Sequence, residues 1–130
     1  MKNILLLATI FLFSNLYSQT NEWEFIGSAP DSNSYYYKPN SENKAWIKIE
    51  SPQLEYINKE GQRKYVDGYQ VTLWQFDCEE KQIGIVQTTT YDKKGLVLNT
   101  LSIKNFEIDM TYVNPDSMGE VYLTAFCQRN

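Results

Sequence analysis

Residues 69–78 form the longest alternating stretch of the chain and predict the central strand of a β-sheet. Successive side chains of a strand face opposite sides of the sheet, so Val71 and Leu73 share one face while Trp74 and Phe76 share the other. Both faces carry bulky apolar side chains. This is typical of a strand in the interior of a sheet rather than at its edge.

Several other segments alternate in the same way or are rich in β-branched and aromatic residues, which favour strands over helices. Short polar breaks separate them, so neighbouring strands are expected to run antiparallel. The pattern predicts an α+β fold in which a meander of about six antiparallel strands packs against one C-terminal helix. The expected strands are residues 22–27, 35–37, 44–50, 69–78, 82–91 and 96–103.

Proline, glycine and short polar residues place the breaks between these strands. Pro52 is expected to stop the third strand, and residues 58–61 read as a turn. Residues 67–68 (Asp-Gly) fit either a turn or a bulge that enters the central strand, and we favour the bulge. Residues 92–95 (Asp-Lys-Lys-Gly) suit a type I hairpin connection, because glycine closes it without steric cost.

The C-terminal segment has helical rather than strand periodicity. Ser117 and Glu120 fit a capping box, in which the serine side chain accepts the Glu120 N–H and the glutamate reaches back to Ser117. An alternative start lies at residues 114–115 (Asn-Pro), with proline at the first helical position. Glu120, Thr124 and Gln128 form one polar line, and apolar residues fill the remaining arc.

Residues 1–18 have the pattern of a secretory signal peptide. A basic residue, Lys2, precedes an apolar run over residues 4–13, and the small residue Ser18 precedes the expected cleavage point. The alternative is an uncleaved anchor, although the run is short for an ordinary transmembrane helix. Cleavage would leave residues 19–130 as a single domain, with no transmembrane helix expected after it, exported to the periplasm, the cell surface or the medium.

Export exposes the chain to oxidising conditions, in which the two cysteines of a small domain are expected to form a disulfide. We therefore predict a bond between Cys78, at the end of the central strand, and Cys127, in the helix. The bond closes a loop of 49 residues, which the chain-entropy estimate values at about 4 kcal/mol.

Charge and composition argue against nucleic acid as a partner and against an enzyme. The formal net charge is −4 and the basic residues are scattered. The chain has no histidine, the usual general base, and no glycine-rich phosphate loop. Asp77, Glu79 and Glu80 could serve as a calcium site or an acid/base pair, but such a cluster is ordinary at a solvated hairpin tip. No catalytic residue, metal or cofactor is expected.

The chain contains ten tyrosines and three tryptophans, residue types that often anchor protein interfaces. Some of the aromatic residues on expected strands and loops must be exposed, namely some of Tyr35, Tyr36, Tyr37, Trp46 and Tyr56. Of these, the candidates for an interaction surface are Tyr35, Tyr37, Trp46 and Tyr56. The alternative is that they belong to the core, because the chain after residue 18 has few Leu and Phe residues. Trp46 lies among lysines, so its ring either covers their aliphatic stems or is free to bind.

The order and spacing of several short motifs resemble those of the surface-adhesin protein E family of exported bacterial proteins, from Trp23 to Cys127. At one corner this chain carries residues 110–112 (Met-Thr-Tyr) where the family usually has tryptophan, so different packing is expected there. The matching motifs are residues 23–28, 35–37, 45–48, 73–78, 91–97 and 115–120.

The resemblance implies a small antiparallel sheet with a C-terminal helix held by the same cysteine pair. It also implies a non-enzymatic surface adhesin whose partners are host extracellular-matrix or serum proteins. Two alternatives stay open: a periplasmic or envelope structural protein without a host ligand, and a carrier of a small molecule. The carrier would require a sizeable apolar pocket between sheet and helix.

Overall fold

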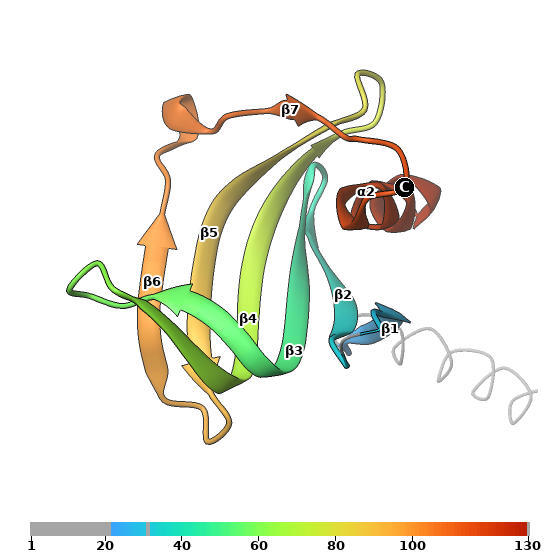
Figure 1. Cartoon of the computed structure of the whole chain (residues 1–130). Coiled ribbons are helices and arrows are strands. Elements are labelled where there is room, and N and C mark those ends of the chain that lie inside the picture. The colour runs from blue at the N-terminus through green and yellow to red at the C-terminus, as the bar shows by residue number, and fades with distance from the viewer. Residues whose placement is uncertain (1–21, 31, 130) are drawn as a thin grey trace, which may run out of the picture.

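The computed structural model describes residues 22–30 and 32–129, and the expected signal peptide lies outside them. Within that range the chain forms one antiparallel sheet and one α-helix (Figure 1). The elements are β1 (Glu24–Ser28), β2 (Ser34–Ser41), β3 (Lys44–Ile57), β4 (Arg63–Asp77), β5 (Gln82–Asp92), β6 (Val97–Ser102), η1 (Asn105–Glu107), β7 (Thr111–Tyr112) and α2 (Met118–Arg129).

Strands β1 to β6 follow one another across the sheet in chain order, which confirms the predicted meander. β4 lies between β3 and β5, so the stretch with bulky residues on both faces is an interior strand, as expected. The short strand β7 was not predicted. Its two residues are too few to give an alternating pattern in the sequence. In the structure it pairs with the start of β5.

The expectation that Pro52 ends the third strand is wrong. β3 continues to Ile57, and the pairing with β4 shifts between Ser51 and Leu54. The shift places Pro52 and Gln53 opposite Asp67 alone, so β3 carries one extra residue in a bulge, where a missing backbone N–H breaks no ladder bond. The bulge faces residues 66–68, where sequence predicted an irregularity, but the extra residue belongs to β3.

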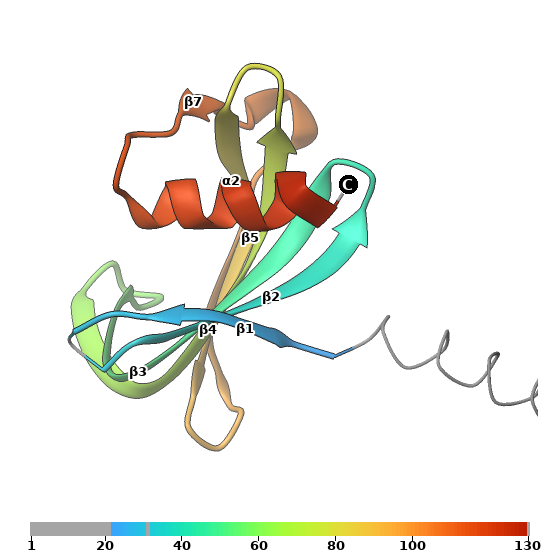
Figure 2. The same cartoon turned by 90° about the vertical axis from the view of Figure 1, so that its right-hand side faces the viewer.

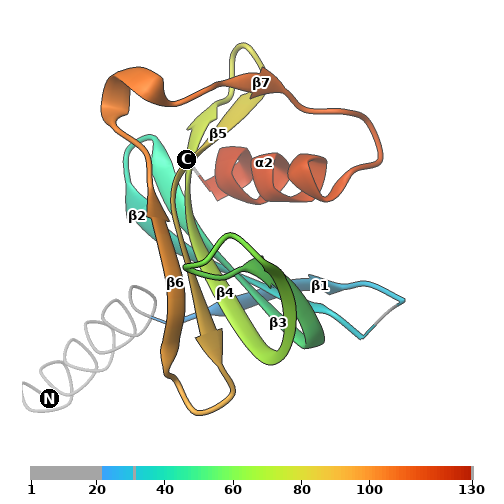
Figure 3. The ribbon, with the colours of Figure 1, turned by 60° about the vertical axis from the view of Figure 1, so that its left-hand side comes forward.

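The sheet is strongly curved beyond this bulge. The outer part of the β3–β4 hairpin bends across the sheet until it meets β6 (Figures 1 and 3). There the side-chain Nδ2 of Asn99 donates a hydrogen bond of 2.7 Å to the carbonyl oxygen of Ile57. Two segments 42 residues apart are thereby joined, and the sheet approaches a half-barrel.

Helix α2 lies across one face of the sheet, called the inner face (Figure 2). Its apolar arc packs on side chains from β2 to β5, with the ring of Phe126 stacked on that of Phe76 at 4.5 Å between centroids. Ala45 and Ile47 of β3 are fully buried beneath it. The polar line of Glu120, Thr124 and Gln128 faces away and is exposed.

The start of α2 is the one the capping box predicts. The N–H of Glu120 donates to Oγ of Ser117 at 3.3 Å. Among the described hydrogen bonds Glu120 makes no return bond, and the Ser117 hydroxyl donates to the carbonyl of Asn114 at 2.6 Å. Half of the predicted box therefore forms, and the alternative start at residues 114–115 does not.

The predicted disulfide joins Cys78 to Cys127, with their Cα atoms 5.9 Å apart. It fastens the second half of α2 to the end of β4. A second tie lies at the helix terminus, where the Arg129 guanidinium forms an ion pair with Glu24 of β1 and lies 4.7 Å from the ring centroid of Tyr37. The helix is thus held both at the end of the interior strand β4 and at the edge strand β1.

Candidate functional site

The face of the sheet opposite α2, called the outer face, carries a ladder of side chains. Strand alternation places on it the residues that do not point at the helix. Cross-strand pairing arranges them in rows over β2, β3 and β4, and each row takes one residue from each strand. The rows are Lys38, Trp46 and Leu73; then Tyr36, Lys48 and Val71; then Ser34, Glu50 and Tyr69.

At the β1 side of this face, aromatic rings and lysines interleave to form the aromatic–lysine cluster (Trp23, Phe25, Tyr36, Lys38 and Lys48). The ammonium of Lys48 lies 4.9 Å from the ring centroids of both Trp23 and Tyr36. Lys38 lies 5.7 Å from that of Trp23. The rings of Phe25 and Tyr36 meet edge to face at 5.7 Å.

These contacts hold large rings in fixed positions near solvent. The Lys48 side chain is only 19% exposed, so its attraction to the two rings is less screened by water than at an open surface. Phe25, in contrast, is 58% exposed although it is among the most apolar residue types. A rigid aromatic surface with an exposed phenylalanine is typical of the anchors of protein interfaces.

The cluster is connected to the next row through a carboxylate. The Tyr36 hydroxyl donates to Oε2 of Glu50 at 3.3 Å, and Lys48 forms an ion pair with Oε1 of the same residue at 3.7 Å. Burial, reinforced by the Glu50 charge, raises the pKa of Tyr36 above its ordinary value. The phenol therefore stays neutral and keeps its donor role over the physiological pH range.

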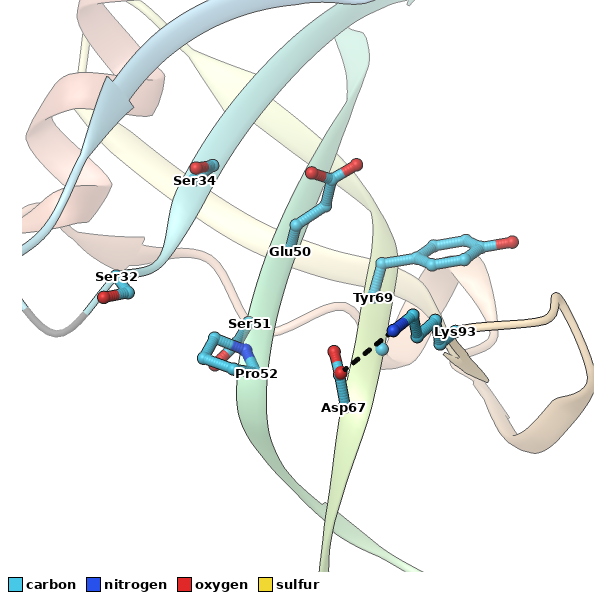
Figure 4. A pocket seen from close by; sticks show the side chains of 9 residues that line it. Ser32, Ser34, Glu50, Ser51, Pro52, Asp67, Tyr69 and Lys93 are labelled. Atoms are coloured by element: carbon cyan, nitrogen blue, oxygen red, sulfur yellow. Dashed lines mark ion pairs between the residues drawn. The ribbon is translucent and has the colours of Figure 1, made fainter.

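A groove of about 440 Å³ continues the outer face from this row (Figure 4). Glu50 and Tyr69 project from β3 and β4 at its upper side, and an ion pair of 3.9 Å joins Asp67 and Lys93 at its lower side. The groove lies at the β3 bulge, because its lining includes Ser51 and Pro52 of β3 and residues 67–68 of β4, where the pairing shifts. Its lining, called the polar groove, consists of Ser32, Ser34, Glu50, Ser51, Pro52, Asp67, Gly68, Tyr69 and Lys93.

A second groove, of about 400 Å³, lies beside the disulfide at the rim of α2. Lys81, Glu120 and Gln128 contribute to its walls together with Val113 and Leu123. This mixed lining differs from the apolar pocket between sheet and helix that a small-molecule carrier would require.

Two of the four predicted interaction residues are corrected by the structure. Tyr35 is 7% and Tyr37 is 1% exposed, and both lie in the core beneath α2. Since strand side chains alternate, the middle tyrosine of this run, Tyr36, takes the outward position. The alternative, that these tyrosines belong to the core, holds for Tyr35 and Tyr37.

The other two predicted residues are half-buried and lie apart. Trp46 belongs to the outer face, in the same row as Lys38, next to the aromatic–lysine cluster. Tyr56 lies beyond the bulge, paired with Lys64 on the bent part of the hairpin. The structure therefore brings Trp46, but not Tyr56, to the candidate face.

Sequence reasoning did not assign Trp23 or Phe25 to the interaction surface. The available signal was their spacing. Trp23 and Phe25 lie two residues apart in the expected first strand, so their side chains share a face. Tyr36 and Lys38 have the same spacing in the neighbouring segment. Recognising this required the pairing register between β1 and β2. That register contains a shift between Phe25 and Gly27, which alternation alone does not reveal.

The acidic hairpin tip contributes to a turn. Oδ1 of Asp77 accepts the backbone N–H of Glu80 at 3.0 Å. Across residues 22–30 and 32–129, no three His, Cys, Asp or Glu side chains come together in a group that could hold a metal ion.

Searches of curated proteins and of solved structures found no match to this chain. Within the part of the chain that the structure covers, no helix has the length and apolar character needed to cross a membrane. Residues 23–128 match the family model described as Surface-adhesin protein E, a range that covers most of the chain, including the sheet, both cysteines of the disulfide and all but the last residue of α2. The chain therefore belongs to the surface-adhesin protein E family.

Proposed function

We propose that this protein is an exported, non-enzymatic surface adhesin that binds host extracellular-matrix or serum proteins through the outer face of its sheet. The observation that carries this proposal is the asymmetry of the sheet. Helix α2 covers the inner face, whereas the outer face presents the aromatic–lysine cluster. Membership of the surface-adhesin protein E family supports the adhesive role.

The chemistry of the cluster favours a protein partner. Phe25 offers an exposed apolar anchor, and neighbouring lysines offer charged donors at the edge of the apolar area. Interfaces commonly combine a few aromatic anchors with such a polar rim. Catalysis would need a different arrangement, with a base or nucleophile held in a cleft, and the outer face carries none of the usual histidine machinery.

Binding to a panel of purified matrix and serum proteins, measured by biolayer interferometry, tests the proposal. Phe25→Ala is expected to weaken binding by about tenfold or more, since truncating an aromatic anchor typically removes over 1 kcal/mol. Tyr112→Ala is the matched control, because Tyr112 is 69% exposed on β7, away from the cluster. Undetectable binding to every protein of the panel would overturn the adhesin proposal.

Protease treatment of intact cells tests the location. A surface adhesin is expected to be degraded without cell lysis. Protection until the envelope is opened would instead favour a periplasmic or envelope structural protein without a host ligand. Cell fractionation tests export itself. N-terminal sequencing of a secreted form in the medium is expected to give Gln19 as the first residue, because it follows the expected cleavage point.

A further inference from the structure

The polar groove has an unusual charge arrangement. Each of its two carboxylates already has a lysine of the same chain beside it: Lys48 lies 3.7 Å from Glu50, and Lys93 lies 3.9 Å from Asp67. A ligand with a net charge of either sign would therefore have to compete with a resident ion pair. A neutral ligand leaves both pairs in place.

The groove nevertheless offers many hydrogen-bonding groups. A carboxylate accepts at several lone-pair positions, so pairing with one lysine leaves acceptor capacity on both Glu50 and Asp67. The hydroxyls of Ser32 and Ser34 can donate or accept, and Ser34 is half-buried at the upper wall. Donors and acceptors thus converge on one space from the β1–β2 connection and three strands (Figure 4).

An aromatic wall completes the groove. The ring of Tyr69 is stacked on that of Tyr91, with centroids 4.7 Å apart and planes inclined by 14°. Stacking fixes the orientation of Tyr69, so its ring edge and hydroxyl present a preformed surface. Ligand sites of about 300–1,000 Å³ typically combine such an apolar wall with a few fixed polar groups, and a groove of about 440 Å³ lies in this range.

From these features we propose that the polar groove binds a neutral saccharide of one or two rings. Sugar hydroxyls donate to carboxylates and exchange hydrogen bonds with serines, and the C–H groups of a sugar ring can contact the ring edge of Tyr69. The groove continues the row next to the aromatic–lysine cluster on the same face. This inference deepens the proposed function: the partner would be a glycoprotein, with its protein part on the cluster and its glycan in the groove.

The test uses free saccharides, so it does not depend on adhesion. The ¹⁵N-labelled protein is titrated with N-acetyllactosamine, chitobiose and mannobiose, and with sialyllactose and a sulfated heparin disaccharide as charged probes. At least one neutral probe is expected to shift the amide signals of residues 50–52 and 67–69 and to bind more tightly than both charged probes. Absence of any shift in this region, or tighter binding of a charged probe, would overturn the inference.

Variants keep the test specific to the groove. Tyr69→Ala and Asp67→Asn are each expected to weaken saccharide binding by about tenfold, the equivalent of one lost hydrogen bond or ring contact. Tyr65→Ala is the matched control, because Tyr65 lies on the same strand, is 58% exposed and does not line the groove. Equal loss in all three variants would contradict a site at this position.

The outcomes of the two proposals remain distinguishable. If adhesion fails but the neutral saccharide binds, the groove inference stands and the matrix or serum partner is wrong. If adhesion succeeds and enzymatic removal of the partner's glycans leaves affinity unchanged, the adhesin proposal stands and the groove does not read the partner's glycan. If deglycosylation of the partner lowers the affinity of the parent protein but not that of Tyr69→Ala, both proposals are supported.

Discussion

Gly68 lies where the backbone of β4 comes close to that of β5. A Cβ atom at this position would lie 2.1 Å from the carbonyl oxygen of Tyr91 and 3.1 Å from the Cα of Asp92. Neither atom can move aside without disturbing the β4–β5 ladder. Glycine is therefore required here by the close approach of two backbones, at the point where the sheet bends and the polar groove opens.

Replacing Gly68 by alanine is expected to lower the free energy of unfolding by about 3 kcal/mol, the upper part of the range for overpacking, since backbone must shift. Urea unfolding followed by circular dichroism measures this. Ser102→Ala, at an exposed position of β6, is the control and should change stability little. Equal stabilities for the two variants would mean that β4 and β5 are farther apart than the structure places them.

A second glycine has a related role. A Cβ at Gly84 would lie 2.8 Å from side-chain atoms of both Ile108 and Met110, which pack over β5 on the way from β6 to β7. Sequence analysis expected different packing in the neighbourhood of residues 110–112. The structure shows Met110 covering a strand position that has no side chain of its own.

At the scale of the element, α2 shows how an apolar arc becomes a docked helix. Tyr122 is buried among aromatic rings, 6.2 Å from that of Tyr35 and 5.8 Å from that of Trp74 between centroids. Burial, with a smaller contribution from Tyr35, raises the pKa of Tyr122 far above its ordinary value. The docked helix therefore requires the neutral phenol.

This burial predicts a pH dependence of stability. Below about pH 10 the phenol is neutral in both folded and unfolded chains, so its contribution to stability is complete. Above that pH the unfolded chain ionises Tyr122 while the folded chain does not, so the free energy of unfolding falls as pH rises. The free energy of unfolding of Tyr122→Phe is expected to fall less steeply than that of the parent protein above about pH 10.

Urea unfolding at several pH values measures that slope. Tyr112→Phe, which removes an exposed phenol, is the matched control. If Tyr122→Phe and the parent protein lose stability in parallel over this range, the phenol is accessible to solvent and the helix is docked less closely than the structure shows.

At the scale of the molecule, the fold depends on contacts that join distant parts of the chain. The Cys78–Cys127 bond links residues 49 apart, and the Arg129–Glu24 ion pair links residues 105 apart. The hydrogen bond from Asn99 to Ile57 closes the curved sheet on its other side. Of these, only the disulfide is covalent, and it alone constrains the unfolded chain.

Removing the disulfide in the double variant Cys78→Ser, Cys127→Ser is expected to reduce the free energy of unfolding by about 4 kcal/mol, because the unfolded chain regains the freedom of a 49-residue loop. Chemical denaturation gives the difference. Reduction of the parent protein should produce a similar loss, whereas Ser117→Ala, which removes only the helix cap, should cost about 1 kcal/mol. A loss below that of the cap variant would contradict a structural role for the bond.

Local patterns were sufficient for much of this fold. Alternation identified the central strand and the capping box identified the start of the helix, because each depends on residues close in sequence. Pro52 misled the prediction because a bulge allows a strand to pass through a proline, and whether a bulge forms depends on the partner strand. Tyr35 and Tyr37 were misplaced for a related reason: a run of three tyrosines alternates, but only the position of α2 decides which side is buried.

The sequence by itself determined the element types, their antiparallel order and the cysteine pair, since turn residues, side-chain periodicity and two lone cysteines leave few alternatives. Only the tertiary structure decided which face of the sheet is free, that Trp23, Phe25, Tyr36 and Lys48 meet there, and that a polar groove opens beside them. Those features depend on strand register and sheet curvature. Both are set by packing between residues far apart in the chain, which no local pattern records.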